Sequence, residues 1–398
     1  MVKIKFKIGP SEKEYDVIKD PVPHILVESK KEMHGWSKAY EPNHARECTA
    51  ERLLVNPYNG CSNSCCFCYA NAMGYSYFSL YLQRKIITVF KDFDKQVAKQ
   101  LDSISVGSCG YLSAATDPFQ KVNEKYRLSE KIIKEFNKRN LPIEIITKSR
   151  ISEEAIDLLK QNKYNFAQVT ILTPNENIRQ KIIPYAADTK TLNENVDRLI
   201  AAKIPTIVRI DPIIPGRTDN LKDLEFMIKK YADKGVKHII TSVLDIPTNI
   251  KQRISNQLSE ETPYFDEQLF TEKIFNDLNK SANYRKKIFN FMRVTCDMAG
   301  ITFATCMEFE LTDEIKAGKP VLKGMNKEFM TSRNCEGIDT PIHIKKDGRF
   351  EPVKNCDGAC LKCNAKPVPC SIPELQKAGK WKLKDYRAWS RWLNNLKL

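Results

Sequence analysis

Three cysteines on one short loop constrain this chain more than any other feature of its sequence. Between Pro57 and Cys68, the cysteines Cys61, Cys65 and Cys68 follow the spacing C-x3-C-x2-C, and Gly60 lets the backbone turn sharply into the loop. Three thiolates on one loop can each bind a different iron atom of an iron–sulfur cube, which would leave one iron open. The spacing therefore predicts a [4Fe-4S] cluster with an open iron.

Two other uses of these cysteines are open. A structural zinc ion usually takes paired C-x2-C hooks with a fourth local ligand, and reduced thiols need no pattern at all. Cys66 breaks the spacing, so it is not expected to be a ligand. The asymmetric spacing favours the cluster over both alternatives.

From residue 51 onward, short apolar runs alternate with amphipathic segments, and residues 1–50 read as an N-terminal extension that opens with a short strand at 2–8. Strands are expected at 52–56, 104–112, 142–147, 166–172, 205–210 and 238–244. Helices are expected at 69–82, 127–139, 152–162, 190–202, 221–234 and 266–299, with one further strand at 302–307. This alternation predicts an α/β fold of parallel strands with right-handed crossovers, which either a barrel or a doubly wound sheet would satisfy.

Polar residues stand where several of the expected strands end. Parallel α/β proteins bind their ligands beyond the carboxyl ends of the strands. These polar residues are therefore candidates for cofactor binding: Thr116, Asp117, Lys148, Ser149, Thr170, Thr173 and Arg209.

The cysteine loop resembles the signature of the radical S-adenosylmethionine (SAM) superfamily, C-x3-C-x-(aromatic)-C, with Phe67 in the aromatic position. More narrowly, the stretch from Asn56 to Ala70 resembles the spore photoproduct lyase-like group, which is also called the DNA repair photolyase-like group. The resemblance recurs at 116–120, 147–149 and 212–219 and covers roughly residues 30–310. It implies a partial (βα)6 TIM-like barrel over 51–310. The cysteines after this region lead us to expect a cysteine-rich C-terminal domain over 311–398.

The resemblance also implies a chemistry. The open iron would chelate S-adenosylmethionine, and one-electron reduction by a partner such as flavodoxin or ferredoxin would yield a 5′-deoxyadenosyl radical that abstracts hydrogen from a substrate. Lys148 is expected to pair with the SAM carboxylate, Ser149, Thr116 or Thr173 to hydrogen-bond it, and Asp117 to accept from the amino group or a ribose hydroxyl. Phe67 is expected to contact the adenine. For Arg209, a buried pair with an aspartate is an equal alternative.

One position departs from the resembled group. Spore photoproduct lyases carry a cysteine hydrogen donor shortly before the residues that match Thr116 and Asp117, and this chain has Ala114 there. Cys109, five residues upstream, is the nearest catalytic candidate. The resemblance therefore carries over the core fold and the cofactor chemistry, and not the thymine-dimer substrate.

The C-terminal region repeats the cysteine spacing. Cys356, Cys360 and Cys363 follow C-x3-C-x2-C, and Cys370 supplies a fourth local thiolate. These four residues predict a second [4Fe-4S] cluster, with a structural zinc ion or free thiols as the alternatives and Cys335 as an alternative ligand. The tail at 381–398 combines basic and aromatic residues, which suits a docked helix or single-stranded nucleic acid.

Composition bears on the compartment and the partners. No apolar run approaches the roughly 18 residues of a membrane helix, and the first residues lack the apolar core of an export signal, so a cytoplasmic protein is expected. The net charge of +15 favours a nucleic-acid partner, although a lysine-rich proteome would explain it equally well. A nucleic acid or nucleotide is therefore the leading substrate. A peptide or protein substrate is the second, and a non-catalytic, metal-stabilised nucleic-acid-binding protein is the alternative from another class.

Overall fold

The computed structural model describes residues 2–8, 11–28, 33, 52–261, 266–316, 318–360 and 363–373. The expected basic and aromatic tail at 381–398 lies outside these residues. Within them, no helix combines the length and the apolar character needed to cross a membrane.

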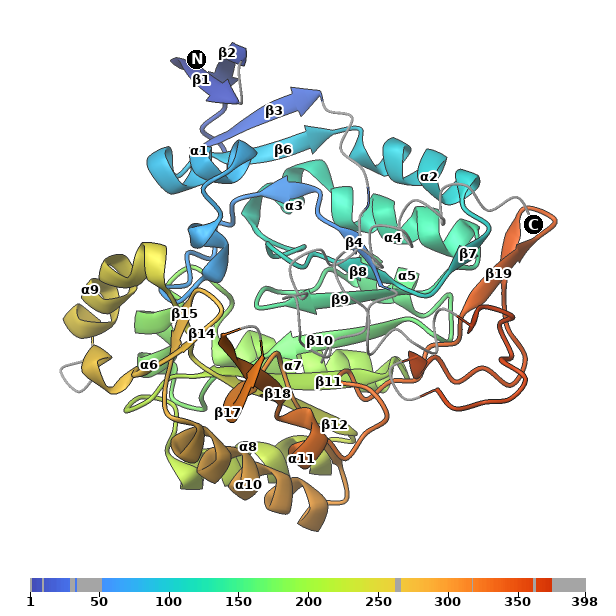
Figure 1. The fold of residues 1–398 in the computed structure, drawn as a ribbon. Helices are drawn as coiled ribbons and strands as arrows, with labels where there is room; N and C mark the ends of the chain where they lie inside the picture. The colour runs from blue at the N-terminus through green and yellow to red at the C-terminus, as the bar shows by residue number, and fades with distance from the viewer. Residues whose placement is uncertain are drawn as a thin grey trace.

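A seven-stranded parallel sheet forms the centre of the molecule (Figure 1). Neighbouring strands follow one another in the sequence, so each strand pairs with the next through a helical crossover. The strands are β4 (Leu53–Val55), β8 (Gly110–Leu112), β9 (Ile143–Thr147), β10 (Phe166–Thr170), β11 (Thr206–Ile213), β12 (His238–Val243) and β16 (Thr302–Thr305). The two outer strands, β4 and β16, do not pair with each other, so the sheet is the open, partial TIM-like barrel that the sequence analysis expected.

Helices cover the outer face of this sheet (Figure 1). They are α2 (Phe93–Ser103), α3 (Lys121–Tyr126), α4 (Leu128–Lys138), α5 (Glu153–Leu159), α6 (Glu176–Ile182), α7 (Thr189–Ala201), α8 (Leu221–Asp233) and α10 (Ala282–Met298). Short polar side chains begin several of them: Ser152, Asp188 and Asn220 each accept a hydrogen bond from the first-turn backbone of the helix that follows.

Two sequence expectations were wrong in detail. The expected strand at 104–112 is two short strands, β7 (Val106–Gly107) and β8. The expected helix at 266–299 starts only at Ala282, because β14 (Glu272–Ile274) and β15 (Asp277–Asn279) form a small sheet with β13 (Ile246–Pro247). Apolar residues in that region satisfy a strand and a helix equally well, so periodicity alone did not separate them.

Two further small sheets precede the second strand of the barrel. β1 (Val2–Ile8) and β2 (Ser11–Val17) form an antiparallel hairpin, which confirms the expected N-terminal strand. β3 (His24–Glu28), β6 (Ile87–Lys91) and β5 (Tyr58–Asn59) form a second sheet, and β6 was not expected. The remaining helical pieces between residues 69 and 84 are η1 (Tyr69–Ala72) and α1 (Ser76–Arg84).

The segments after the barrel lie at its two ends. The hairpin β17 (Phe309–Lys316) and β18 (Lys319–Gly324) directly follows the carboxyl end of β16. The hairpin β19 (His343–Lys346) and β20 (Arg349–Pro352) instead pairs with β7, which precedes β8. It also bonds to Arg139 and Asn140, which both precede β9. The C-terminal extension therefore packs against the amino ends of the strands. The last short helices are η2 (Thr248–Ile250), α9 (Lys251–Glu261), η3 (Glu267–Leu269) and α11 (Asn326–Phe329).

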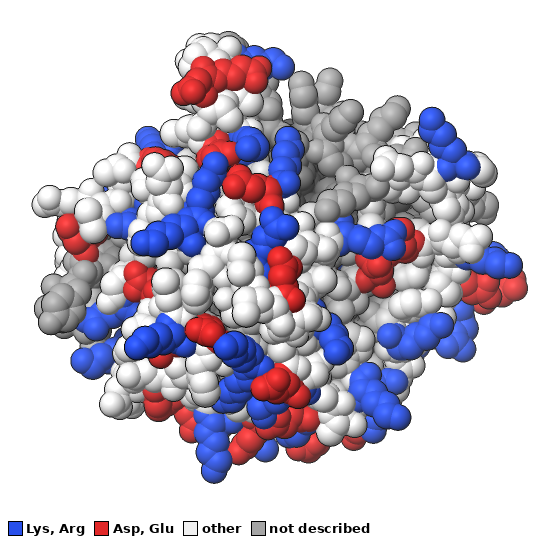
Figure 2. Space-filling view, turned by 90° about the horizontal axis from the view of Figure 1, so that it is seen from below, with Lys and Arg blue, Asp and Glu red and all other residues white. Residues whose placement is uncertain are grey.

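Charge is mixed on the face that carries α8 and α10. Figure 2 shows lysine and arginine interspersed with aspartate and glutamate on this side of the molecule. The net charge of +15 is therefore not gathered into one patch on that face.

A glycine pair tests the packing of the C-terminal segment against the barrel. Gly337 and Gly348 both have positive φ, 67° and 80° respectively, so alanine at either costs about 1–2 kcal/mol of backbone strain. A Cβ at Gly337 would also lie 2.2 Å from the His238 ring of β12, whereas one at Gly348 would meet nothing within 4 Å. We expect Gly337→Ala to lower the thermal unfolding midpoint clearly more than Gly348→Ala, because the overpacking adds about 1–3 kcal/mol. Equal midpoints in circular dichroism would show that this segment does not pack on β12.

Candidate metal and cofactor site

The three-cysteine loop lies beyond the carboxyl end of β4. Gly60 has φ 84°, and a Cβ there would come within 2.5 Å of the Tyr81 ring on α1, so the turn into the loop requires glycine. The Tyr81 hydroxyl donates to the carbonyl of Cys61 at 2.5 Å and thereby fixes the start of the loop.

Two residues of the 116–120 segment hold the loop in place. Gln120 accepts a hydrogen bond from the Ser62 backbone N–H at 3.0 Å and donates to the Gly60 carbonyl at 3.1 Å. Asp117 accepts from the Asn63 amide at 3.0 Å. This segment, which the sequence analysis expected to contact the cofactor, therefore fastens the cysteine loop to the barrel.

Asp117 is almost fully buried, and both of its oxygens are engaged. Besides Asn63, it accepts from the Lys148 and Phe119 backbone N–H groups at 2.7 and 2.9 Å and from the Thr147 hydroxyl at 2.8 Å. Burial raises the pKa of Asp117, and the hydrogen bonds from Lys148, Phe119 and Thr147 oppose that rise. The carboxyl group thus links the cysteine loop to the end of β9.

Ser149 and Thr173 also have partners within the protein. The Ser149 hydroxyl donates to the Asn63 carbonyl oxygen at 3.3 Å and accepts from its amide nitrogen at 3.0 Å. The Thr173 hydroxyl accepts from the Asn175 backbone N–H at 3.2 Å. Both residues stand at strand ends, as expected, but their hydroxyls position neighbouring loops.

Other polar groups at the strand ends have no partner. The hydroxyl oxygens of Ser113, Thr116 and Thr170 are buried and make no hydrogen bond. Thr170 lies opposite Arg209 in the register of β10 and β11, on the same face as Gln168, whose side chain points into the barrel toward Arg209. Buried hydroxyls usually have a partner, so these three are available, among the described residues, to bond a polar ligand or water.

Electrostatics also point to a ligand at the cysteine loop. Burial raises the pKa of the thiols of Cys61, Cys65 and Cys68, and neighbouring thiolates raise those of Cys61 and Cys65 further. The Lys148 ammonium lowers the pKa of Cys65 and Cys68, and Lys148 makes no ion pair within the described residues. A bound metal cluster would reverse this balance, because coordinated thiols ionise. The Lys148 ammonium also interacts with the Asp117 and Asp211 carboxylates. The three thiols and this neighbouring charge therefore fit a metal cluster.

Arg209 and Phe67 both have partners within the protein. The Arg209 guanidinium donates to Asp211 at 3.0 Å and to Gln168 at 2.9 Å, which is the buried pair named as its alternative. The Phe67 ring is 9% exposed and packs with Leu172, Ile182 and Ile214. Neither geometry tests an adenine contact, which stays a prediction for Phe67.

Two cysteines in the barrel have surroundings that differ from those expected. Cys109 is fully buried, packs with Phe166 and Ile207, and does not face the strand ends, so the structure does not support it as a catalytic residue. Cys306, which sequence reasoning treated as core packing, is partly exposed just beyond β16. Its neighbours Arg209 and Asp211 influence its pKa, which burial raises to about 12. The sequence gave no signal for it, because its neighbours come from distant strands.

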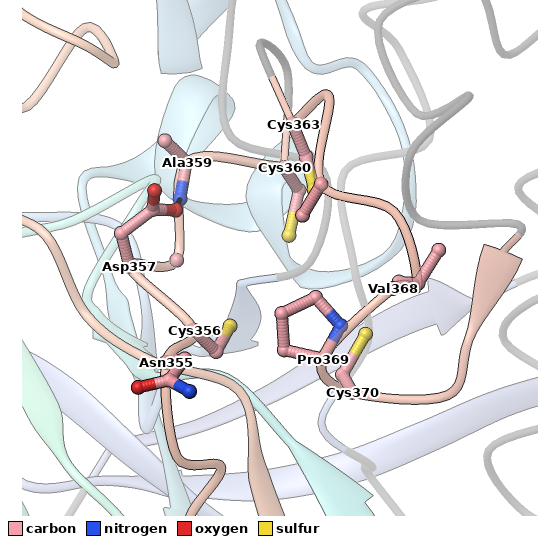
Figure 3. Close-up of a pocket in the computed structure, with 11 residues that line it drawn as sticks. Asn355, Cys356, Asp357, Ala359, Cys360, Cys363, Val368, Pro369 and Cys370 are labelled. Carbon is pink, nitrogen blue, oxygen red and sulfur yellow. Dashed lines mark hydrogen bonds between the residues drawn. The ribbon is translucent and has the colours of Figure 1, made fainter.

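The C-terminal cysteines surround one small pocket. Cys356, Cys360, Cys363 and Cys370 line it from two arms of the chain, with Pro369 between them (Figure 3). Burial is the main reason that the pKa of Cys370 is raised, and Cys356 and Cys363 raise it further. These thiols therefore lie within electrostatic range of Cys370. The structure thus brings together the four residues that the spacing grouped.

Cys335 does not belong to this group. It does not line the pocket, its carbonyl accepts a hydrogen bond from His238 of β12 at 3.1 Å, and its thiol influences Cys306. Cys335, which was named as an alternative ligand of the C-terminal site, therefore lies beside the barrel instead of at that pocket.

Neither cysteine set forms a site for a single ion. Among the residues that the structure describes, no three histidine, cysteine, aspartate or glutamate side chains form a group that could hold one metal ion. This finding gives no support to zinc at either place. It does not test a cluster, whose thiolates bind separate iron atoms.

Comparison with known proteins agrees with the geometry. Residues 55–231 match the family model described as the radical SAM superfamily. The chain is 29% identical over 359 residues to a protein of Pseudomonas phage M6 named radical SAM Nalpha-GlyT isomerase, with 86% of this chain and 73% of that protein covered. It is 24% identical over 197 residues to an uncharacterized protein of Methanocaldococcus jannaschii, with 48% of this chain and 70% of that protein covered.

A solved structure shares the fold. A spore photoproduct lyase mutant with dinucleoside spore photoproduct has a TM-score of 0.53 and 12% sequence identity, and the match covers 71% of this chain and 81% of that one. At this identity the likeness concerns the arrangement of strands and helices. It confirms the partial barrel.

The Asp117 contacts lead to a test of cluster retention. Asp117 now accepts hydrogen bonds from N–H and O–H groups, and Asp117→Asn would place an amide N–H donor against some of them. Each group left unpaired would cost about 1–3 kcal/mol. We expect the reconstituted variant to hold clearly less iron and to lose it faster to a chelator. Asp188→Asn is the matched control, because Asp188 only begins α7. Equal iron retention in the two variants would contradict the positioning role.

Proposed function

We propose, from the match of residues 55–231 to the radical SAM superfamily model, that this chain is a radical SAM enzyme. It uses S-adenosylmethionine at the three-cysteine loop to abstract hydrogen from a nucleic acid or nucleotide. When bound, the [4Fe-4S] cluster and S-adenosylmethionine supply a 5′-deoxyadenosyl radical. The observation that carries the proposal is the three-thiol loop with the Lys148 ammonium near it. The hydroxyls of Thr116 and Thr170, which have no hydrogen-bond partner among the described residues, support it.

The protein's own residues divide into two groups in this proposal. Lys148 pairs with the carboxylate of S-adenosylmethionine, and Thr116 or Thr170 donates a hydrogen bond to its polar groups. The second group is Asp117, Gln120 and Ser149. These residues act indirectly, because their hydrogen bonds set the position of the cysteine loop. The barrel wall excludes water from the reacting atoms, which is what the protein contributes to cofactor chemistry.

The substrate class rests on the resemblance to the spore photoproduct lyase-like group and on the net charge of +15. The phage relative supports a reaction class as well, because it is named as an isomerase. We therefore place an isomerisation, in which hydrogen is removed and later returned, ahead of a lyase or transferase reaction. A flavodoxin or ferredoxin is the proposed reductant.

We also propose a second [4Fe-4S] cluster on Cys356, Cys360, Cys363 and Cys370. Four local cysteines around one pocket would occupy every iron, so this cluster would offer no open position. The neighbouring hairpin of β19 and β20 contacts the amino ends of the strands, whereas the first site lies at their carboxyl ends. A role in stability or electron transfer fits this place better than substrate binding.

The substrate proposal is tested by 5′-deoxyadenosine release. Reduced, reconstituted protein is given cell extract that was treated with nuclease or with protease, each removed before the assay. We expect the extract to stimulate 5′-deoxyadenosine formation and nuclease treatment alone to abolish the stimulation. Loss after protease alone would move the substrate to peptides or proteins, and absence of any S-adenosylmethionine cleavage under strong reduction would favour the non-catalytic alternative.

The second cluster is tested by iron content. Protein with Cys61, Cys65 and Cys68 changed to alanine should still bind close to one four-iron cluster after anaerobic reconstitution, because the C-terminal set is intact. Cys66→Ala and Cys335→Ala are the controls and should keep the full iron content, because Cys66 is buried in an apolar cluster and Cys335 does not line the C-terminal pocket. Iron near zero in the triple variant would refute the second cluster.

A further inference from the structure

Cys306 stands where the last strand of the barrel ends. Its backbone N–H donates to the Thr241 carbonyl at 2.7 Å, one step beyond the pair of Thr241 and Thr305, so it continues the ladder between β12 and β16. Ile240 pairs with Ala304 in the same ladder. Because alternate residues of a strand share one face, Cys306 lies on the face of Ala304 and Ile240.

This face is the inside of the barrel. On the other face, Val208 and Ile239 share a buried cluster with Leu199 of α7 and Leu224 of α8, so helices cover that side. Cys306 packs instead against a separate buried cluster, whose members come from β8, β10, β11 and β12. The Cys306 side chain therefore faces the barrel interior.

Three inward-facing residues at the ends of neighbouring strands are partly exposed. They are Asp211 of β11, Ser242 of β12 and Cys306. Ser242 follows Ile240 by two residues and donates a hydrogen bond to Asp211, which places the first two side by side. Because these residues face the interior and are not buried, the described side chains leave room for a ligand beside them.

The groups proposed to bind S-adenosylmethionine lie at the same end of this face. Thr147 pairs with Val169, so Lys148 and Thr170 come next on β9 and β10. Thr170 pairs in turn with Arg209 of β11. The Thr170 hydroxyl is buried, at 2% residue exposure, and has no hydrogen-bond partner among the described residues, so it is available to a ligand on this face. The thiol of Cys306 and these groups thus border one ligand layer.

The Cys306 thiol keeps its hydrogen at neutral pH. Burial raises the pKa of Cys306 to about 12, although the charge of Arg209 opposes that rise. The thiolate is the form that acts as a nucleophile, so a protonated thiol is poorly suited to that task. An S–H bond is weaker than a C–H bond, and a carbon-centred radical can therefore take a hydrogen atom from it.

We propose that Cys306 donates the hydrogen atom that ends the reaction. This inference rests on the proposed function, in which the 5′-deoxyadenosyl radical takes a hydrogen atom from the substrate and becomes 5′-deoxyadenosine. The rearranged substrate radical then takes hydrogen from Cys306: the S–H bond breaks, a C–H bond forms in the product, and a thiyl radical remains. One electron from the flavodoxin- or ferredoxin-type reductant and one proton from water restore the thiol.

The test locates deuterium after reactions in deuterium oxide. Full-length, reconstituted protein is reduced with dithionite, without any added thiol, and given S-adenosylmethionine. Thiol hydrogens exchange with the solvent, so Cys306 carries deuterium. Without substrate, we expect the radical to take this deuterium and yield labelled 5′-deoxyadenosine. With the nucleic-acid fraction of a cell extract, the label should appear instead in nucleosides recovered by digestion, and Cys306→Ala should lose most of the label in both reactions.

Two further variants and one chemical measurement control for folding. Cys306→Ser should behave like Cys306→Ala, and Cys296→Ala is the matched control, because Cys296 is a buried cysteine of α10 on the outside of the barrel. All three variants should keep their iron. In the reconstituted protein, peptide mapping should show that N-ethylmaleimide modifies Cys306 faster than Cys109 and Cys296, which are fully buried.

The outcomes separate this inference from the proposed function. An unchanged label in the Cys306 variants, loss of their iron, or modification of Cys306 no faster than that of Cys109 would each overturn the inference. Nucleic acid that stimulates 5′-deoxyadenosine formation without gaining label would also overturn it, because hydrogen would then return from 5′-deoxyadenosine. Absence of 5′-deoxyadenosine from the unaltered protein would instead refute the proposed function on which the inference rests.

Discussion

The barrel depends on a buried guanidinium at its amino end. Arg52 is 1% exposed, and it donates to Glu336 through two nitrogens and to Ser108 at 2.7 Å, with Glu144 3.4 Å away. A charge at this depth is tolerated only when it is paired and hydrogen-bonded, and removal of one partner costs about 3–5 kcal/mol. Because Glu336 comes from the C-terminal segment, this pair makes that segment a part of the barrel.

The polar contacts continue from this pair toward the other end. Gln168 donates to Glu144 at 2.5 Å, Arg209 donates to Gln168 and to Asp211, and Ser242 donates to Asp211. These residues come from successive strands, so their hydrogen bonds cross the interior and fix the strand register from within. The row ends at the carboxyl edge beside Thr170, where the hydroxyl has no partner. Polar contacts thus run from the amino end of the strands to their carboxyl edge, although one Glu144 oxygen has no hydrogen-bond partner among the described residues.

Much of this arrangement could be predicted from local patterns. The parallel strands, most of their crossover helices and both cysteine groups follow from periodicity and spacing, which act over short distances along the chain. The role of Asp117 could not be predicted, because a polar residue at a strand end gives the same signal whether its partner is a ligand or a loop. For Arg209 the sequence left a cofactor contact and a buried aspartate pair as equal alternatives. Cys306 and β6 were missed for the related reason that their partners, Arg209 and β3, come from remote segments.

The two cysteine groups share one spacing and have opposite surroundings. The first has an unpaired ammonium and unpaired hydroxyls beside it, so the protein leaves room there for a ligand with charge of its own. The second is closed by a fourth cysteine, and the turn at Gly358 is so tight that a Cβ would lie 1.8 Å from the Thr340 carbonyl oxygen. Thr340 follows the segment that carries Glu336, the partner of Arg52. Spacing alone therefore shows where thiols gather along the chain, and the atoms around them show how far the surroundings of the two groups differ.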